Sequence, residues 1–288
     1  MKQLEVTAIQ RGCVYDGMGV RTTVFLKGCP FSCPWCCNPE TLYSSPLFFI
    51  DNQKCIKEKG LSSSLCRKCI RNGGFDTLEC CPFGVSEATS RLLSVEELAN
   101  YLLRDKDLFY LSGGGVTFSG GEPIIHIPNL LPLLEILNSE QINCTMETTL
   151  YCKNDRGILG VIPYVDEWIV DLKLQQENYR EDYDDVIMHN LQILRDSNAN
   201  ILYRLVFIDS MDANEIVKRL KKIDVLSIEV LKCHALAESK YHKLGLSFKG
   251  YVPSEKYYSD FVNALLMVGI ELKRLHYNIL KYRFQRGV

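Results

Sequence analysis

A dense group of cysteines near the start of the chain constrains its fold and chemistry more than any other feature. Residues 28–39 read GCPFSCPWCCNP. The preceding residues 22–27 are rich in β-branched and aromatic side chains, which predicts a strand that leads into this loop. Several thiols on one short loop are typical of metal or iron–sulfur ligation. The sequence therefore predicts such a site at the end of a strand, with a Cys-x3-Cys-x2-Cys set made of Cys29, Cys33 and Cys36.

The number of cysteines bears on the compartment. The chain has 13 cysteines among 288 residues, and it opens without the basic segment and apolar run of a secretory signal. We therefore expect a cytoplasmic protein, a compartment in which disulfides do not persist. Metal or cluster ligation is the better interpretation of the grouped cysteines. The isolated ones are expected to be small buried hydrophobes: Cys13, Cys144, Cys152 and Cys233.

Charge and hydropathy argue against two classes of partner. The formal net charge is −2 at pH 7, so nothing attracts the chain as a whole to nucleic acid or to an anionic membrane. The longest apolar runs, such as residues 264–270, are far too short to span a bilayer. With 47% hydrophobic residues, the chain can bury one large core. We expect neither a nucleic-acid partner nor a membrane.

A second group of cysteines coincides with a change in composition. Residues 48–88 combine cysteines, lysines and small polar residues with little apolar periodicity. This segment is predicted to be an insertion folded around metal, and residues 1–47 and 89–288 are predicted to form the main domain. The cysteines of the insertion are Cys55, Cys66, Cys69, Cys80 and Cys81.

Predicted strands and helices alternate through the main domain. Such alternation favours an α/β fold with parallel strands and helical crossovers. Six strands suit a partial (β/α)6 barrel better than a complete eight-stranded one. A capping box of Ser94 and Glu97 marks the start of the first helix. The predicted strands are residues 22–27, 115–118, 142–147, 167–172, 201–207 and 226–231, and the further helices are residues 129–138, 187–196, 212–223 and 254–268.

Unusual polar residues fall at the ends of these predicted strands. In βα barrels the C-terminal rim carries the chemistry, because its loops converge on one mouth. We therefore expect one face of the barrel to collect the candidate groups. After the cysteine loop these are Gly120, Gly121, Glu122, Glu147, Thr148, Asp171, Lys173, Arg204 and His234.

Several motifs, in unbroken order along the chain, resemble those of a known family. The three-cysteine motif has Trp35 before its last cysteine and is followed by a Gly-Gly-Glu-Pro turn, which is similar to the radical S-adenosylmethionine (SAM) superfamily. More narrowly, the chain resembles the activating enzymes of glycyl radical enzymes, of the pyruvate formate-lyase activating type. The motifs that carry this resemblance are residues 15–21, 27–30, 38–40, 112–123, 171–173 and 239–241.

This resemblance implies a cofactor and a reaction. Three thiolates on a [4Fe–4S] cluster leave one iron without a protein ligand, and that iron can bind the amino and carboxylate groups of SAM. Such enzymes reductively cleave SAM to a 5′-deoxyadenosyl radical, which removes a hydrogen from the Cα of one glycine in a partner glycyl radical enzyme. The family also implies a flavodoxin or ferredoxin-type reductant as electron donor.

Roles for the rim residues follow from the same resemblance. Gly120 and Gly121 would let the backbone approach the methionyl amino group, and Glu122 would secure that turn. The resemblance also implies which ligand the other residues contact. Arg204 and Lys173 would bind the methionyl carboxylate, and Trp35 and His234 would flank the adenine. Glu147, Thr148 and Asp171 would bind a monovalent cation, and Asp16 would contact the partner peptide.

The insertion resembles the ferredoxin-like insert of many of these activating enzymes. Its five cysteines are too few for two clusters, so the resemblance implies one auxiliary [4Fe–4S] cluster without an open iron. The Cys-Pro ending of the bacterial ferredoxin motif favours Cys81 as its last ligand. The expected ligands are Cys55, Cys66, Cys69 and Cys81, with Cys80 as the alternative to Cys81.

Other interpretations of these residues stay open. A Cys-x2-Cys pair is often a structural zinc site, and a zinc-stapled binding protein would be inert toward SAM. An electron carrier would hold two clusters and leave SAM intact. Within the superfamily, the main alternative is a diverged enzyme that modifies another peptide or a small molecule, because Met18 and Cys37 stand where relatives usually have proline and histidine.

Overall fold

One nine-stranded sheet is the framework of the residues that the computed structural model describes, which are 2–44, 47–61, 81, 83–174 and 180–273. The strand order is β11-β10-β9-β8-β7-β6-β2-β1-β5. The strands of this sheet are β1 (Gln3–Cys13), β2 (Arg21–Leu26), β5 (Arg91–Ser94), β6 (Gly115–Gly120), β7 (Asn143–Thr148), β8 (Glu167–Asp171), β9 (Ile201–Phe207), β10 (Ser227–Lys232) and β11 (Glu271–Leu272).

Six neighbouring strands, β2 and β6 to β10, pair in parallel, and they correspond to the six strands predicted from the sequence. The strand order has two ends, β11 and β5, so the sheet is open. The expected α/β class with a partial (β/α)6 barrel is confirmed. The sequence did not predict β1 or β5, which extend the sheet by antiparallel pairing beside β2.

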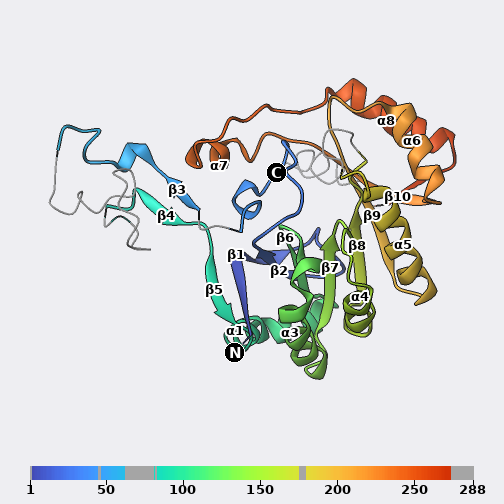
Figure 1. Cartoon of the computed structure of the whole chain (residues 1–288), viewed down its shortest axis with the longest axis horizontal. Coiled ribbons are helices and arrows are strands. Elements are labelled where there is room, and N and C mark those ends of the chain that lie inside the picture. Colours follow the sequence, from blue (N-terminus) through green and yellow to red (C-terminus); the bar gives the residue numbers. More distant parts are fainter. Residues whose placement is uncertain (1, 45–46, 62–80, 82, 175–179, 274–288) are drawn as a thin grey trace, which may run out of the picture.

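Helices line the outer side of the curved row of strands in Figure 1, whereas the loop after β2 lies on the inner side. The capping box of Ser94 and Glu97 begins α1, as predicted. None of the described helices is both long and apolar enough to cross a bilayer. The helices are α1 (Val95–Leu102), α2 (Lys106–Ser112), α3 (Ile127–Ser139), α4 (Asp155–Val161), α5 (Tyr183–Asp196), α6 (Ala213–Lys222), α7 (Glu238–Lys243) and α8 (Glu255–Met267).

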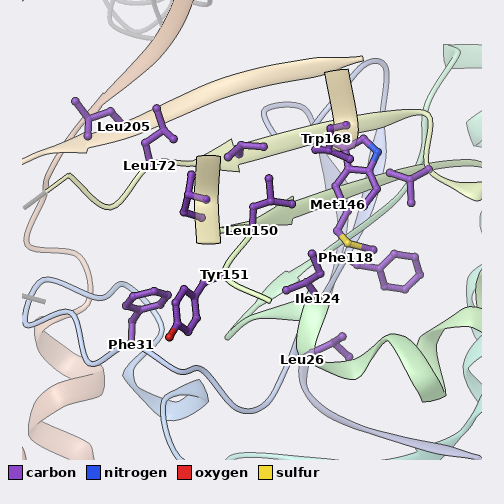
Figure 2. Packing of buried hydrophobic residues seen from close by; sticks show 14 of the residues in the cluster. Leu26, Phe31, Phe118, Ile124, Met146, Leu150, Tyr151, Trp168, Leu172 and Leu205 are labelled. Atoms are coloured by element: carbon purple, nitrogen blue, oxygen red, sulfur yellow. The ribbon is translucent and has the colours of Figure 1, made fainter. Parts of the chain in front are cut away.

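The core forms where the parallel strands meet these helices. Phe118 on β6, Met146 on β7, Trp168 on β8 and Leu205 on β9 are each 0% exposed, and Figure 2 shows them on successive strands. Strands that are covered on both faces read as nearly continuous apolar runs. This apolar frame holds the C-terminal ends of β2 and β6 to β10 at one rim, where polar side chains follow the apolar ones.

Two short strands stand apart from the main sheet. β3 (Phe48–Ile50) and β4 (Ser86–Ala88) pair antiparallel as a separate sheet, seen at the far end of Figure 1 from α8. They bound the segment that the sequence predicts to be an insertion. Of its cysteines, Cys55 is buried and Cys81 is partly buried, whereas Cys66, Cys69 and Cys80 lie outside the described residues.

Candidate active site

A cavity of about 230 Å³ opens at the C-terminal rim of the parallel strands. Its walls come from the cysteine loop and from the ends of β6, β7 and β8, which is the rim that the sequence predicts to carry the chemistry. Ten of the predicted site residues line it: Cys29, Cys33, Trp35, Cys36, Gly120, Gly121, Glu147, Thr148, Asp171 and Lys173.

The three spaced thiols of the cysteine loop all belong to residues that line this cavity. Burial raises the pKa of the Cys29 thiol to about 12, and it also raises the pKa values of Cys33 and Cys36. Thiols of this kind ionise when a metal replaces their protons. The loop also donates a backbone hydrogen bond from Asn38 N to the Cys36 sulfur, over 3.4 Å. Soft, desolvated sulfur ligands that face one cavity fit an iron–sulfur cluster.

One end of the cysteine loop is fixed by aromatic packing. The Phe31 ring meets the rings of Tyr151 and Tyr183 edge-on, with centroid distances of 5.4 and 5.7 Å. The Arg180 guanidinium lies over the Tyr151 ring and donates to the Pro30 carbonyl through Nη2 over 2.9 Å. These contacts position the backbone between the first two cysteines independently of any ligand.

The Gly120-Gly121 turn packs against the start of the cysteine loop. Gly120 has φ +105, a conformation that favours glycine. A Cβ on Gly121 would lie 2.1 Å from the Gly28 carbonyl oxygen. The next residue, Glu122, donates its backbone N–H to that same oxygen over 2.8 Å. The backbone of Gly121 lies so close to the backbone of Gly28 that position 121 requires glycine.

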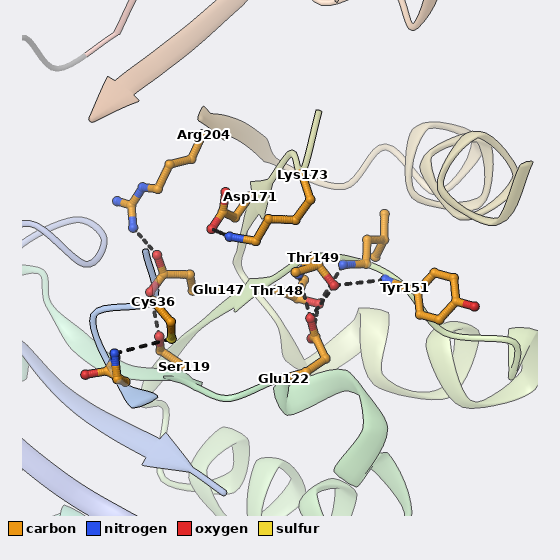
Figure 3. Close-up of polar contacts among 12 residues, drawn as sticks. Cys36, Ser119, Glu122, Glu147, Thr148, Thr149, Tyr151, Asp171, Lys173 and Arg204 are labelled. Carbon is orange, nitrogen blue, oxygen red and sulfur yellow. Dashed lines mark hydrogen bonds and ion pairs between the residues drawn. The ribbon is translucent and has the colours of Figure 1, made fainter. Parts of the chain in front are cut away.

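Glu122 is 0% exposed and organises the end of β7 rather than lining the cavity. Figure 3 shows its carboxylate accepting hydrogen bonds from the hydroxyls of Thr148 and Thr149. It also accepts from the backbone N–H of Thr149 over 2.7 Å and from that of Ile124 over 3.2 Å. Burial raises the pKa of Glu122, whereas these hydrogen bonds act in the opposite direction. The side chain of Glu122 thus contacts the end of β7 and Ile124, and its role at the glycine turn stays a prediction.

Among the described residues that line the cavity, Lys173 is the one with a cationic side chain. Its Nζ lies 2.5 Å from Asp171 Oδ2, and the two side chains are 13% and 17% exposed. Burial alone would lower the pKa of Lys173, but the Asp171 carboxylate raises it well above the usual value for lysine. Asp171 Oδ1 is buried without a hydrogen-bond partner in the described structure. This pair therefore offers a polar ligand both an ammonium group and an open carboxylate oxygen.

Arg204 lies outside the cavity lining, with a side chain that is 5% exposed. Figure 3 shows its guanidinium paired with Glu147 of β7, and its Nε lies 2.5 Å from Glu229 Oε2 of β10. Nη2 donates to the Tyr15 carbonyl over 3.1 Å. The other oxygen of Glu147 accepts a hydrogen bond from Ser119 over 2.6 Å. Each nitrogen of Arg204 and each oxygen of Glu147 is therefore engaged by a protein group.

Three predicted residues occupy different surroundings. Trp35 is 4% exposed and lines the cavity, its ring meets Tyr251 at 5.8 Å, and its Nε1 has no partner among the described residues. His234 is exposed and does not line the cavity, and its Nδ1 accepts from Leu236 N over 3.3 Å. Asp16 is not among the lining residues, and its carboxylate accepts a hydrogen bond from the Thr23 hydroxyl over 2.6 Å.

Sequence patterns did not identify the groups that hold these side chains. Glu229, Ser119, Tyr183 and Arg180 come from four different parts of the chain. Ser119 belongs to the glycine-rich motif, whose pattern did not assign the serine a role. Glu229 stands within an apolar strand, and a buried acid there signals a paired base. The sequence does not show that this base is Arg204.

Comparisons with known proteins agree with this geometry. A family model described as "4Fe-4S single cluster domain" matches residues 15–194. The chain is 30% identical over 274 residues to the 4-hydroxyphenylacetate decarboxylase activating enzyme of Clostridium scatologenes, covering 84% of this chain and 86% of that protein.

Two further relatives carry similar names. The pyruvate formate-lyase 2-activating enzyme of Escherichia coli (strain K12) is 30% identical over 246 residues, with coverage of 82% of this chain and 80% of that protein. The (2S)-3-sulfopropanediol dehydratase activating enzyme of Klebsiella oxytoca is 30% identical over 281 residues, with coverage of 84% and 85%. All these matches span most of both chains.

Proposed function

The chain belongs to the family of glycyl radical enzyme activating enzymes, and from this premise we propose how its own residues serve that activity. It is a radical SAM oxidoreductase that reductively cleaves S-adenosylmethionine and abstracts a hydrogen from a backbone glycine of a partner glycyl radical enzyme. The observation that carries the proposal is that Cys29, Cys33 and Cys36 line one cavity, which Lys173 and Asp171 also line.

The three thiols would hold a [4Fe–4S] cluster with one open iron. A cluster bound there would supply the electron, and SAM would supply the carbon radical that takes the glycine hydrogen. The protein's part is to bind, orient and exclude water. The buried walls of the cavity support this part, since Cys33 and Trp35 are 7% and 4% exposed.

Within this site we assign the methionyl carboxylate to Lys173, because it is the cation that lines the cavity. Arg204 is expected to act indirectly, by holding Glu147 in place. Trp35 presents a flat ring to the cavity and suits the adenine, whereas a role for His234 at the adenine would require the exposed segment around residue 234 to move.

We also propose a monovalent cation beside Glu147, Thr148 and Asp171. Of the side-chain oxygens of these three residues, Asp171 Oδ1 is the one without a hydrogen-bond partner in the described structure, so it is available to bind the ion. Both oxygens of Glu147 accept hydrogen bonds from Ser119 and Arg204, and the Thr148 hydroxyl donates to Glu122. Activity measured in sodium, potassium and tetramethylammonium salts tests this ion. Equal rates in all three would leave the cation without a role.

For the insertion we propose one auxiliary [4Fe–4S] cluster, with electron relay or structural support as its role. Its support is the grouping of five cysteines in the sequence between β3 and β4. Iron content is the test: changing Cys66 and Cys69 to Ala should reduce about eight irons per chain to about four. Unchanged iron would contradict the auxiliary cluster without affecting the SAM site.

The reductant and the compartment are part of the same proposal. We propose a flavodoxin or ferredoxin-type protein as the electron donor and the cytoplasm as the location. Stopped-flow reduction of the anaerobic holoenzyme by reduced flavodoxin and by reduced ferredoxin would identify the donor. Failure of both to reduce the cluster that dithionite reduces would contradict this choice.

The activity itself is tested in two steps. Anaerobically reconstituted protein should release 5′-deoxyadenosine from SAM on reduction with dithionite, and it should then generate a glycyl radical in a partner enzyme, detected by electron paramagnetic resonance (EPR). An electron carrier would leave SAM intact. SAM cleavage without a radical on any glycyl radical enzyme tested would favour the diverged enzyme that acts on another peptide or small molecule.

A further inference from the structure

The short helix α7 lies about 200 positions after the cysteine loop in the sequence, and its side chains contact that loop. Lys240 Nζ donates to Asn38 Oδ1 over 2.9 Å and to Glu40 Oε1 over 2.6 Å. The Tyr241 hydroxyl donates to the Cys36 carbonyl over 3.1 Å. These contacts join a helix after β10 directly to the backbone of the third cysteine.

The same part of the loop is also held by the two residues that follow β2. Lys27 Nζ donates to the Glu40 carbonyl over 3.1 Å, and Gly28 N donates to the Thr41 carbonyl over 2.7 Å. Glu40 is 6% exposed and Thr41 is 0% exposed. The turn of residues 38–41 is thus clamped between β2 and α7, and the position of Cys36 depends on both.

Lys240 also brings a positive charge to the cysteine loop. Its side chain is 36% exposed, and the side chain of its partner Glu40 is 8% exposed. Its Nζ lies 2.9 Å from Oδ1 of Asn38, which is two residues after Cys36. Lys240 therefore places an ammonium group beside the region that a cluster on the three thiols would occupy.

We propose that Lys240 and Tyr241 are positioning residues that fix the cysteine loop around its cluster, and that the charge of Lys240 favours reduction of that cluster. This inference rests on the proposed function, because it requires the cluster. The one-electron reduction adds negative charge beside the loop, and a nearby cation stabilises the reduced form more than the oxidised form. Tyr241 acts through geometry alone, because its hydroxyl is neutral.

The experiment uses reconstituted holoenzyme without SAM or partner, and four variants. The midpoint potential of the cluster is followed by EPR, and the rate of iron loss to a chelator reports how firmly the loop holds it. We expect Lys240→Met to lower the midpoint potential and accelerate iron loss several-fold, and Lys240→Arg to retain most of both properties. Tyr241→Phe should accelerate iron loss with little change in potential.

Lys243→Met is the matched control, because it removes the same charge from an exposed position of the same helix. It should leave both readouts unchanged. Identical potentials and iron-loss rates in Lys240→Met and Lys243→Met would overturn the inference. If circular dichroism shows that Lys240→Met does not fold, the Glu40→Gln variant is measured instead. Faster iron loss than in wild type, without a lower midpoint potential, supports positioning by the Lys240–Glu40 pair. Iron loss at the wild-type rate overturns the inference.

The outcomes separate this inference from the proposed function. Wild-type protein that binds no cluster, or that binds one and does not cleave SAM, contradicts the proposed function. Wild-type protein that does both, with Lys240 and Tyr241 variants that behave like Lys243→Met, contradicts the positioning role alone.

Discussion

Arg204 and Glu229 face each other in the register of β9 and β10, and their Nε and Oε2 atoms lie 2.5 Å apart. Their side chains are 5% and 0% exposed. A second acid, Glu147, pairs with the same guanidinium from β7. Because a buried charge is stable only when it is paired, this triad ties three strands together, and one of its members, Glu147, lines the cavity.

Replacing Arg204 by Met should destabilise the protein strongly, because it leaves two carboxylates without their countercharge. Removing one partner of a buried ion pair costs about 3 to 5 kcal/mol of unfolding free energy. Urea unfolding of the anaerobic protein measures the loss. A matched Arg204→Met/Glu229→Met double variant should regain part of it. A single variant as stable as wild type would contradict the pairing.

The glycine turn makes a prediction about cluster retention. Gly121→Ala would bring a Cβ to 2.1 Å from the Gly28 carbonyl oxygen, so the cysteine loop must shift. We expect a marked loss of iron per chain after reconstitution. Gly160→Ala in α4 is the control, because no atom lies within 4 Å of its added Cβ, and it should keep full iron and gain up to about 1 kcal/mol from helix propensity. Equal iron in both variants would contradict this packing.

Lys173 should affect SAM binding more than cluster binding. If its ammonium holds the methionyl carboxylate, Lys173→Met should raise the Kd for SAM about ten- to hundredfold, the range of a lost charge-assisted hydrogen bond. Equilibrium dialysis with reconstituted protein measures the Kd, and iron content shows that the cluster is intact. Lys153→Met, at a lysine that is 66% exposed and paired with Asp182, should leave SAM binding unchanged. Equal affinities in the two variants would remove Lys173 from the carboxylate.

Stability at acidic pH should depend on Asp105. Its carboxylate accepts 2.8 Å hydrogen bonds from Arg11 Nε and from Thr22, and the bond from Arg11 lowers its pKa against the opposing effect of burial. The folded pKa lies below the unfolded value of about 3.9, so this contribution is complete above that pH and disappears as the pH falls through the folded pKa.

Asp105→Asn therefore should cost about 1.5 to 3 kcal/mol at pH 7 and lose less stability than wild type on acidification. Urea unfolding at a series of pH values between neutrality and about pH 3 measures both effects. Parallel stability curves for the two proteins would exclude Asp105 as the source of the acid sensitivity.

Local patterns were sufficient to predict the barrel strands. The sequence places a strand at residues 201–207, and β9 spans Ile201–Phe207. Apolar runs of this kind are specified by burial, which the sequence expresses directly. β1 was missed because its eleven residues alternate irregularly between buried and exposed positions, and it pairs antiparallel with β2 and β5. Its place depends on neighbours that a single run of sequence does not reveal.

Ten of the predicted site residues line the cavity, but the sequence predicted less well which groups these side chains contact. Cys29, Cys33 and Cys36 line the same cavity because they share one loop, which spacing alone indicates. Arg204 was expected at a ligand, but its donors are taken by Glu147 of β7, Glu229 of β10 and the Tyr15 carbonyl. These partners lie 57, 25 and 189 positions away in the sequence, so only the folded sheet brings them together.

Reductive cleavage of SAM tests the central claim most directly. Anaerobically reconstituted protein, reduced with dithionite, should convert SAM to 5′-deoxyadenosine and methionine. Cys33→Ala should abolish this conversion, and Cys152→Ala, at a half-buried cysteine outside the cavity lining, should retain it. SAM left intact by wild-type protein that holds a reducible [4Fe–4S] cluster would contradict the account.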